Sequence, residues 1–212
     1  MKGITFGSYH SFRYLKLIVQ GKELASPAVK VKKIDIEGAD SALDYTDFFG
    51  EPKYEDMTHK FDFVTIVPEG EFPSLFSTVK NALHGKKMRI ILDDDPLFYY
   101  LGRPHVSGFT NDRNIGTIHI EVECEPYKYK VERTVVSRAV SGSASITLTN
   151  SRKRAVPSIT TTATMNIAFG GFSRSVSAGT FTIPELELVE GANTVTVTGT
   201  GTITFTWQEG SL

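Results

Sequence analysis

The final part of the chain alternates apolar and polar residues with a period of two. Within residues 193–207 (NTVTVTGTGTITFTW), the even positions from 194 onward are threonine and the odd positions from 195 onward are apolar or glycine. Successive side chains of a strand point to opposite faces, so this ladder predicts one core face and one threonine face. Gly199 and Gly201 interrupt the apolar face. We expect the chain to turn back there as a hairpin, with a sharp bend as the alternative.

The rest of the pattern divides into a mixed first part and a second part made of strands alone. The second part predicts strands in SASITLT, near TTTATMNIAF and in SVSAGTFTI, besides the ladder, which is typical of a small sandwich. The first part predicts one helix, FPSLFSTVKNALHGKK, with Pro73 in its first turn and Gly85 as a left-handed C-terminal cap. Short strands are expected around LKLIV, VKVKKIDI, HKFDFVTIV, MRIIL and TIHIEVEC.

Amino-acid composition also differs between these two parts of the chain. All eight tyrosines precede residue 130, whereas threonine and serine dominate from Val131 onward. We therefore predict a boundary near YKYKVERT, with domains 1–130 and 131–212.

Bulk properties exclude several classes of protein. The net charge of −1, from 23 basic and 24 acidic residues, argues against a general binder of nucleic acid or anionic membranes. The single cysteine, Cys124, excludes an internal disulfide. No apolar run is long enough to span a bilayer, so we expect a soluble protein made in a cytoplasm.

Three consecutive aspartates, Asp93, Asp94 and Asp95, form the densest group of carboxylates. Oxygen ligands of this kind suit Mg²⁺ or Ca²⁺. However, adjacent strand residues point to opposite faces, and Asp before Pro commonly starts a turn. We expect turn residues and no metal.

The other candidates for catalysis do not form a recognisable set. Glu121, Glu123 and Glu125 alternate with apolar residues and predict the wet face of a strand, although glycoside hydrolysis would need two carboxylates across a cleft. No spacing typical of a metal site or a catalytic motif links the histidines. We predict no enzyme, no cofactor and no catalytic residue. The five histidines are His10, His59, His84, His105 and His119.

The basic cluster Arg152, Lys153 and Arg154 lies in a predicted loop. Such short charge runs are usually solvated, and phosphate binding is the alternative.

Several phrases resemble the distal tail proteins of siphophages and prophages of Gram-positive bacteria. These are GSYHSFRYLKLIV, IEGADSALDYTDFFGEPKY, LHGKKMRIILDDDPLFYYLGR, ECEPYKY and the final WQEGSL, and they follow the order of that family. The resemblance spans essentially the whole chain.

The resemblance implies a mainly β fold. An N-terminal ring-forming β-sandwich with one α-helix and an extended hairpin would be followed by a small galectin-like β-sandwich. It further implies a structural hub at the virion tail tip, assembled in the host cytoplasm. A homo-hexamer would join the tail tube protein to the tail-associated and receptor-binding proteins around a channel for DNA, without contact to a membrane.

A second function remains open, since galectin-like folds also bind carbohydrate and could help attachment to the host cell wall. The expected sugar platform is poor, because Phe205 and Trp207 fall on the apolar face of the ladder. The first domain also holds Phe48, Phe49, Tyr99 and Tyr100 in or near loop-like stretches. Each of these taken alone is expected in the core, whereas the aromatic residues of this domain as a set exceed what a small sandwich would bury and are expected to include ring contacts. We expect a neutral or acidic channel, with Arg152–Arg154 outside it.

Overall fold

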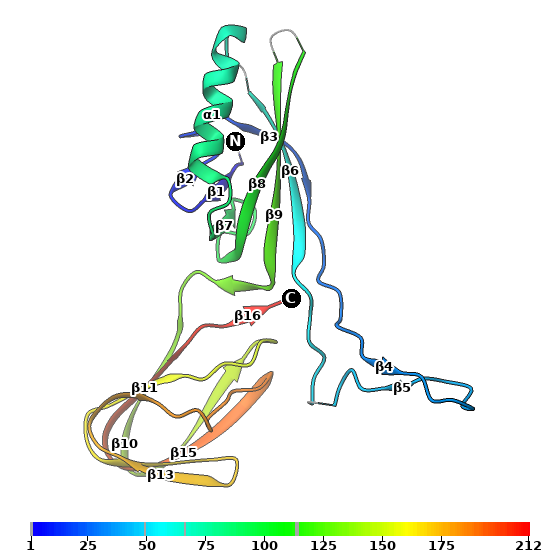
Figure 1. The fold of residues 1–212 in the computed structure, drawn as a ribbon. Helices are drawn as coiled ribbons and strands as arrows, with labels where there is room; N and C mark the ends of the chain where they lie inside the picture. Colours follow the sequence, from blue (N-terminus) through cyan, green and yellow to red (C-terminus); the bar gives the residue numbers. More distant parts are fainter. Residues whose placement is uncertain (1, 49, 66, 113–114) are drawn as a thin grey trace. The chain divides into compact units, whose positions relative to one another are not determined.

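The computed structural model describes residues 2–48, 50–65, 67–112 and 115–212, and the chain forms two compact units (Figure 1). Unit 1 contains Met1–Lys128 together with Leu212, and unit 2 contains Tyr129–Ser211. Strands dominate both units, as the alternating pattern predicts. The mainly β fold expected from the sequence is confirmed.

Unit 1 is built on one sheet with the strand order β2-β1-β7-β8-β9-β6-β3. The last two residues of β9 belong to unit 2. The strands are β1 (Ile4–Phe6), β2 (Tyr9–His10), β3 (Ile18–Glu23), β6 (Met57–Thr65), β7 (Met88–Leu92), β8 (Phe98–Asp112) and β9 (Ile115–Lys130).

The alternation in β6 and β9 separates a core face from a solvent face. In β6 the odd positions from Met57 to Thr65 are buried, and β9 buries the even positions from Gly116 to Cys124. The two strands pair antiparallel, with Phe61 opposite Ile120, so their apolar rows lie on the same side of the sheet. These rows form the centre of the unit 1 core.

The single α-helix of the described residues, α1 (Phe72–Leu83), follows a short 3₁₀ turn, η1 (Glu69–Glu71). Its apolar stripe places Val79 and Leu83 in the core, and Figure 1 shows the helix alongside the sheet. Gly85 has a φ of +75°, the left-handed conformation that the sequence predicts after the helix. Its N–H donates to the carbonyl of Pro104 at 2.8 Å.

Residues 24–56 leave the sheet as an arm between β3 and β6. The arm contains the two-residue strands β4 (Lys33–Ile34) and β5 (Leu43–Asp44), which pair antiparallel, and an isolated bridge between Val29 and Tyr54. None of its described residues is buried. The strand predicted for VKVKKIDI is therefore mostly irregular, because its alternating apolar positions have no sheet to cover.

Unit 2 contains a second sheet, in which β10 (Thr134–Asn150) pairs with β15 (Gly191–Trp207) over 17 residues. On its other side β15 pairs first with β12 and then with β11. β12 pairs in turn with β13, and β11 pairs with β14. Their bounds are β11 (Ser158–Thr161), β12 (Met165–Phe169), β13 (Phe172–Val176) and β14 (Gly179–Thr182), and β16 (Gly210–Ser211) is the last strand of the chain.

The hairpin predicted at Gly199 and Gly201 is wrong. Both residues lie inside β15, with φ values of +146° and +148°, and the pairing with β10 continues through them. Gly142, opposite Gly199, also has a positive φ of +87°. The three glycines therefore mark a bend in a continuous two-stranded ribbon, because only glycine adopts these conformations without strain. We call Gly142, Gly199 and Gly201 the corner.

The apolar face of the ladder is core on both sides of the corner. Val195, Val197, Ile203, Phe205 and Trp207 are all buried. The indole N–H of Trp207 donates to Asn150 Oδ1 at 3.1 Å, so the polar group of the largest side chain is satisfied inside the core.

Candidate assembly surfaces

The arm presents the largest set of exposed apolar side chains in the described part of unit 1. Its main-chain groups pair within the arm, since Lys30 N–H donates to Lys53 O and Glu55 N–H donates to Ala28 O. The side chains point outward instead of forming a core. An apolar surface of this kind on a monomer typically marks a contact with another macromolecule. Its large members are Leu24, Val29, Val31, Ile34, Ile36, Leu43 and Phe48.

The base of the arm is fixed by a buried histidine. His59, on the core face of β6, accepts the N–H of Ala25 through Nδ1 at 3.1 Å. Its ring meets the ring of Tyr100 edge to face, with centroids 4.5 Å apart. Because His59 is fully buried, desolvation lowers its pKa from the usual 6.5. The neutral imidazole thus ties the start of the arm to the strand that follows it.

The aromatic residues singled out in the first domain have different positions. Phe48 is 71% exposed at the arm and touches Tyr45. Tyr99 and Tyr100 lie in β8, at core positions as expected for each taken alone: Tyr99 is buried with the Arg89 guanidinium over its ring, and Tyr100 packs half-buried against the core. Phe49 lies outside the described residues.

A second apolar surface of unit 1 lies between β2 and the start of β3. Phe12 and Tyr14 are exposed there, and Tyr14 borders a groove of about 340 Å³ that continues along α1. Lys16, also on the groove, has a φ of +55°, the one positive value among described residues other than glycine. Strained backbone of this kind persists only where the surrounding structure holds it. Neither periodicity nor composition indicates this surface.

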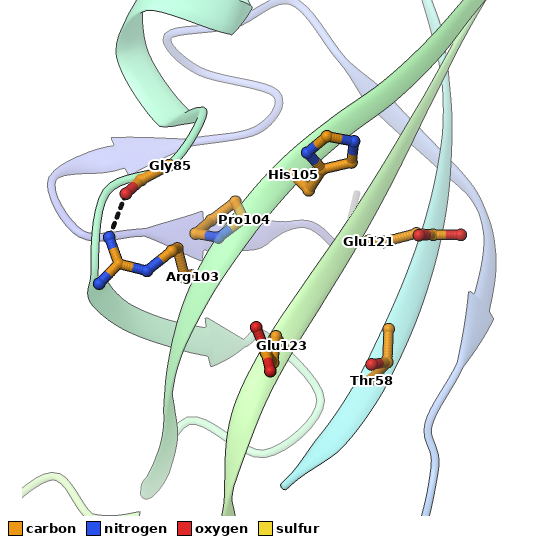
Figure 2. Close-up of a pocket in the computed structure, with 7 residues that line it drawn as sticks. All are labelled: Thr58, Gly85, Arg103, Pro104, His105, Glu121 and Glu123. Atoms are coloured by element: carbon orange, nitrogen blue, oxygen red, sulfur yellow. Dashed lines mark hydrogen bonds between the residues drawn. The ribbon is translucent and has the colours of Figure 1, made fainter.

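The solvent face of β6, β8 and β9 contains a recess of about 330 Å³ (Figure 2). Glu121 and Glu123 project from β9, Thr58 from β6 and His105 from β8. The Arg103 guanidinium donates to the carbonyl of Gly85 at the rim.

The carboxylates that line this recess share one strand and one face, so they do not oppose one another across a cleft, as glycoside hydrolysis would require. Glu125 is held elsewhere by Lys87, at 2.7 Å. The polar face predicted for the strand with Glu121, Glu123 and Glu125 is therefore present in β9.

The histidines of the described chain do not converge on one site, although two of them are neighbours. His84 Nδ1 accepts the N–H of Val106 at 3.1 Å, and its ring lies 4.7 Å from that of His105. His119 pairs with Asp62 at 2.6 Å. No group of three or more His, Cys, Asp or Glu side chains placed to hold a metal occurs among the residues described.

The three consecutive aspartates have three separate sets of partners. Asp93 pairs with His10 and accepts the N–H of Gly3 at 2.7 Å. Asp94 pairs with Lys2 and Lys22, and the hydrogen bonds from these two ammonium groups lower its pKa to about 2.

Asp95 pairs with Lys128 at 2.8 Å, and Lys128 Nζ also lies over the ring of Phe98. The aspartates therefore tie the turn after β7 to the residues just before β1 and to β2, β3 and β9.

The arginines of the basic cluster of unit 2 form ion pairs. Arg152 pairs with Glu190 at 2.6 Å and Arg154 with Glu187 at 2.9 Å. Lys153 Nζ donates to the hydroxyl of Tyr129 at 2.6 Å. The carboxylates offset the arginine charges, which weakens the alternative of a phosphate site.

A buried carboxylate that the sequence did not single out joins three segments of unit 2. Glu209 pairs with Lys130 at 2.5 Å, accepts the Ser151 hydroxyl at 2.5 Å and also accepts the Thr134 hydroxyl. Although burial alone would raise its pKa, these three donors together lower it below the usual 4.5. The only signal was its place in the terminal WQEGSL.

The comparisons with known proteins define a fold. No protein-family model matches the sequence, and no curated protein matches it. Solved structures do match: the fold is that of phage tail hub and baseplate proteins. The chain is similar over its whole length to the SPP1 Dit (gp 19.1) protein, described as a paradigm of the hub adsorption apparatus in phages that infect Gram-positive hosts, with a TM-score of 0.72 and 15% identity, covering 98% of this chain and 99% of that chain.

A chain of the phage p2 baseplate, in its activated conformation with Sr, matches with a TM-score of 0.50 and 6% identity, covering 99% of this chain and 98% of that chain. At such identities the likeness establishes the fold. The resemblance to distal tail proteins inferred from the sequence is confirmed at that level.

Proposed function

We propose that this protein is a structural distal tail protein, a hub at the tip of a phage tail. Six copies form a ring that joins the tail tube protein to the tail-associated and receptor-binding proteins and lets DNA pass through its channel. The observation that carries the proposal is the full-length likeness to the SPP1 Dit hub protein. The protein works at the virion tail tip and assembles in the host cytoplasm.

In this proposal residues 1–130 make the ring and residues 131–212 form an outward galectin-like domain. A closed ring repeats one head-to-tail interface, so each subunit needs two different complementary surfaces. Unit 1 carries two candidates, the arm and the surface around Phe12 and Tyr14. Obligate interfaces of this kind bury about 2,000 Å² or more. The described residues of the arm include no buried one, which suits this role, since their apolar area is available to a neighbour.

The channel has to let DNA pass without holding it. Cationic side chains bind phosphate through release of counterions, so a neutral or acidic lumen is required. The paired state of Arg152 and Arg154 with glutamates supports a position for this cluster away from the channel.

Carbohydrate binding is the rival function, and the positions of the aromatic side chains disfavour it. Sugar sites commonly use an exposed aromatic platform, whereas Phe205 and Trp207 are buried. The likeness of a domain to sugar-binding folds does not confer that activity. Titration of the whole protein with host wall polysaccharide tests this: saturable micromolar binding, lost on mutation of one exposed side chain, would favour the rival.

The ring is tested by removing the apolar surface of the arm. The triple variant Val31→Asp, Ile34→Asp, Ile36→Asp should fold normally, because these side chains are exposed, yet should not assemble. Imaging of tails made with the wild-type protein should show a sixfold layer at the tip, and tails made with the triple variant should lack it. The matched control, Val156→Asp with Val189→Asp, changes exposed valines of unit 2 and should assemble.

A tip layer of another symmetry would contradict the proposal. So would assembly of the arm variant, or contacts made mainly by residues after 131.

A further inference from the structure

One long strand of unit 2 has a partner on one side only. β10 pairs with β15 along all 17 residues, and in the described chain no main-chain hydrogen bond joins residues 134–150 to any segment other than β15. In an antiparallel pair, alternate residues direct their N–H and C=O groups away from the partner strand. The outer edge of β10 therefore carries a row of main-chain donors and acceptors that fit another strand.

The second half of this edge lacks the features that usually block such pairing. Residues Ser143–Thr149, which we call the edge run, lie between the corner glycine Gly142 and the buried Asn150. The run SASITLT contains no charge and no proline, whereas the first half of β10 carries Arg138. Natural sheets protect exposed edges with charges, proline, bulges or very short strands. The opposite edges of this sheet, β13 and β14, are short, with 5 and 4 residues.

The side chains of the edge run alternate in a way that suits pairing with itself. Ser143, Ser145, Thr147 and Thr149 are exposed, while Ile146 and Leu148 are buried on the opposite face. The pattern is symmetric about Ile146. An antiparallel pair centred there puts hydroxyl opposite hydroxyl, since Ser145 meets Thr147 and Ser143 meets Thr149. It also puts apolar opposite apolar, since Ala144 meets Leu148.

We propose that the edge run is a homotypic docking site, at which β10 of a second copy of this chain adds antiparallel and joins the two unit 2 sheets. The contact is isologous, because the same run serves both copies. It belongs to the strand-addition class, in which main-chain hydrogen bonds supply affinity and alternate side chains fix the register. It is independent of the proposed ring, whose contacts lie in residues 1–130.

Like charges introduced at residues that face each other in the proposed register test the proposal in the full-length protein. In the variant Ser145→Lys, Thr147→Lys each lysine would face a lysine of the second copy, and like charges directly opposite destabilise a sheet. We expect association to weaken about tenfold. The variant Ser145→Glu, Thr147→Glu should weaken association in the same way. An equimolar mixture of the Lys and Glu variants should restore pairing, because each lysine would then face a glutamate of the other copy.

The matched control places the same charges one strand inward. Thr196 lies opposite Ser145 and Thr194 opposite Thr147 in the β10–β15 ladder, so Thr194→Lys with Thr196→Lys adds two lysines to the same face away from the edge. Native mass spectrometry then reads copy number, and thermal melting checks that every variant is folded. At a protein concentration between the two dissociation constants, wild type and control should be mainly paired and have twice the mass of the mainly unpaired Lys variant, whether a single chain or a ring is what pairs.

Equal masses for wild type and the Lys variant would overturn the proposal. Association of more than two chains, or of more than two rings, through the edge run would also overturn it. So would dissociation of the control to the same extent as the edge variant. Loss of the ring in the arm variant with retention of pairing would show that the two contacts are separate.

Discussion

Gly142 and Gly199 lie directly opposite one another in the β10–β15 ladder, and both have positive φ values, +87° and +146°. With Gly201 at +148°, the bend occurs in both strands at the same level. Two strands that pair without interruption can serve both sides of a core only if they turn together. The corner thus lets 17 paired residues contribute buried side chains at both ends, from Val195 to Trp207.

Substitution at the corner should destabilise unit 2. A Cβ at Gly201 would lie 2.8 Å from Thr162 Oγ1 and 2.9 Å from Met165 Cε, and the backbone conformation is unfavourable for alanine in any case. We expect Gly201→Ala to lower the free energy of unfolding by about 1–3 kcal/mol. Denaturant unfolding measures this, with the exposed Ser141→Ala as control. A change below about 0.5 kcal/mol would show that the bend does not need glycine.

Stability should fall on mild acidification because of His59. Its pKa is lowered in the folded state by burial, so the unfolded chain binds the proton more readily. The contribution is complete above pH 6.5 and is lost as the pH falls below that value toward the lower folded pKa. Unfolding midpoints between pH 7.5 and 5 test this. The pKa values of Asp93, Asp94 and Glu209 are also lowered in the folded state. Their contributions to stability are lost only at lower pH, below the usual values of 3.8 for Asp and 4.5 for Glu.

The matched variant for the acid effect is His59→Phe, which keeps an aromatic ring but cannot titrate. It should be less stable at neutral pH by about 1–3 kcal/mol, because the Ala25 N–H loses its acceptor. Its slope of stability between pH 6.5 and 5 should be clearly smaller than that of wild type. An unchanged slope would assign the effect to another group.

Loss of the Glu209 carboxylate should destabilise unit 2. Glu209→Ala leaves Lys130, Thr134 and Ser151 without their shared acceptor, at a cost of about 1–3 kcal/mol. The exposed pair is the comparison: Glu190→Ala removes a partner of Arg152 and should cost less than about 1 kcal/mol. The pKa of Glu209 is lowered, so its contribution is present above pH 4.5 and disappears as the pH falls through the folded value. Equal costs for the two variants would contradict the distinction.

Cys124 should be inert in the folded protein. The thiol is buried in the core of unit 1, and burial raises its pKa to about 12. Because the thiolate is the reactive form, a thiol reagent at pH 8 should modify Cys124 only as fast as the protein opens. The rate should rise steeply with denaturant. Rapid stoichiometric reaction of native protein would place the thiol at the surface.

Periodicity predicted the elements whose two faces meet different surroundings. The ladder, the strand around Phe61 and the helix ending before Gly85 each have one face on a core, so their patterns are visible in the sequence. The same rule failed in the arm, where VKVKKIDI alternates without a core beneath it. Alternation reports that two faces differ, and it does not report whether the apolar face meets the same chain or another one.

The remaining misses are nonlocal. Gly199 and Gly201 are compatible with a hairpin or a bend, and only the continuous pairing with β10 decides between them. Glu209 is a charged residue near a terminus, and its donors lie 58–79 residues away in sequence.

Because no described residue of the arm is buried, its side chains can serve contacts between subunits without also serving the folding of their own subunit. Substitutions of the exposed apolar side chains of the arm should hardly change the folding of an isolated subunit, so a screen for expression or heat resistance would not detect them. Their effects would emerge only when subunits meet. Under the proposed function, the arm is therefore the segment in which tail lineages can change partners without first having to rescue a weakened core.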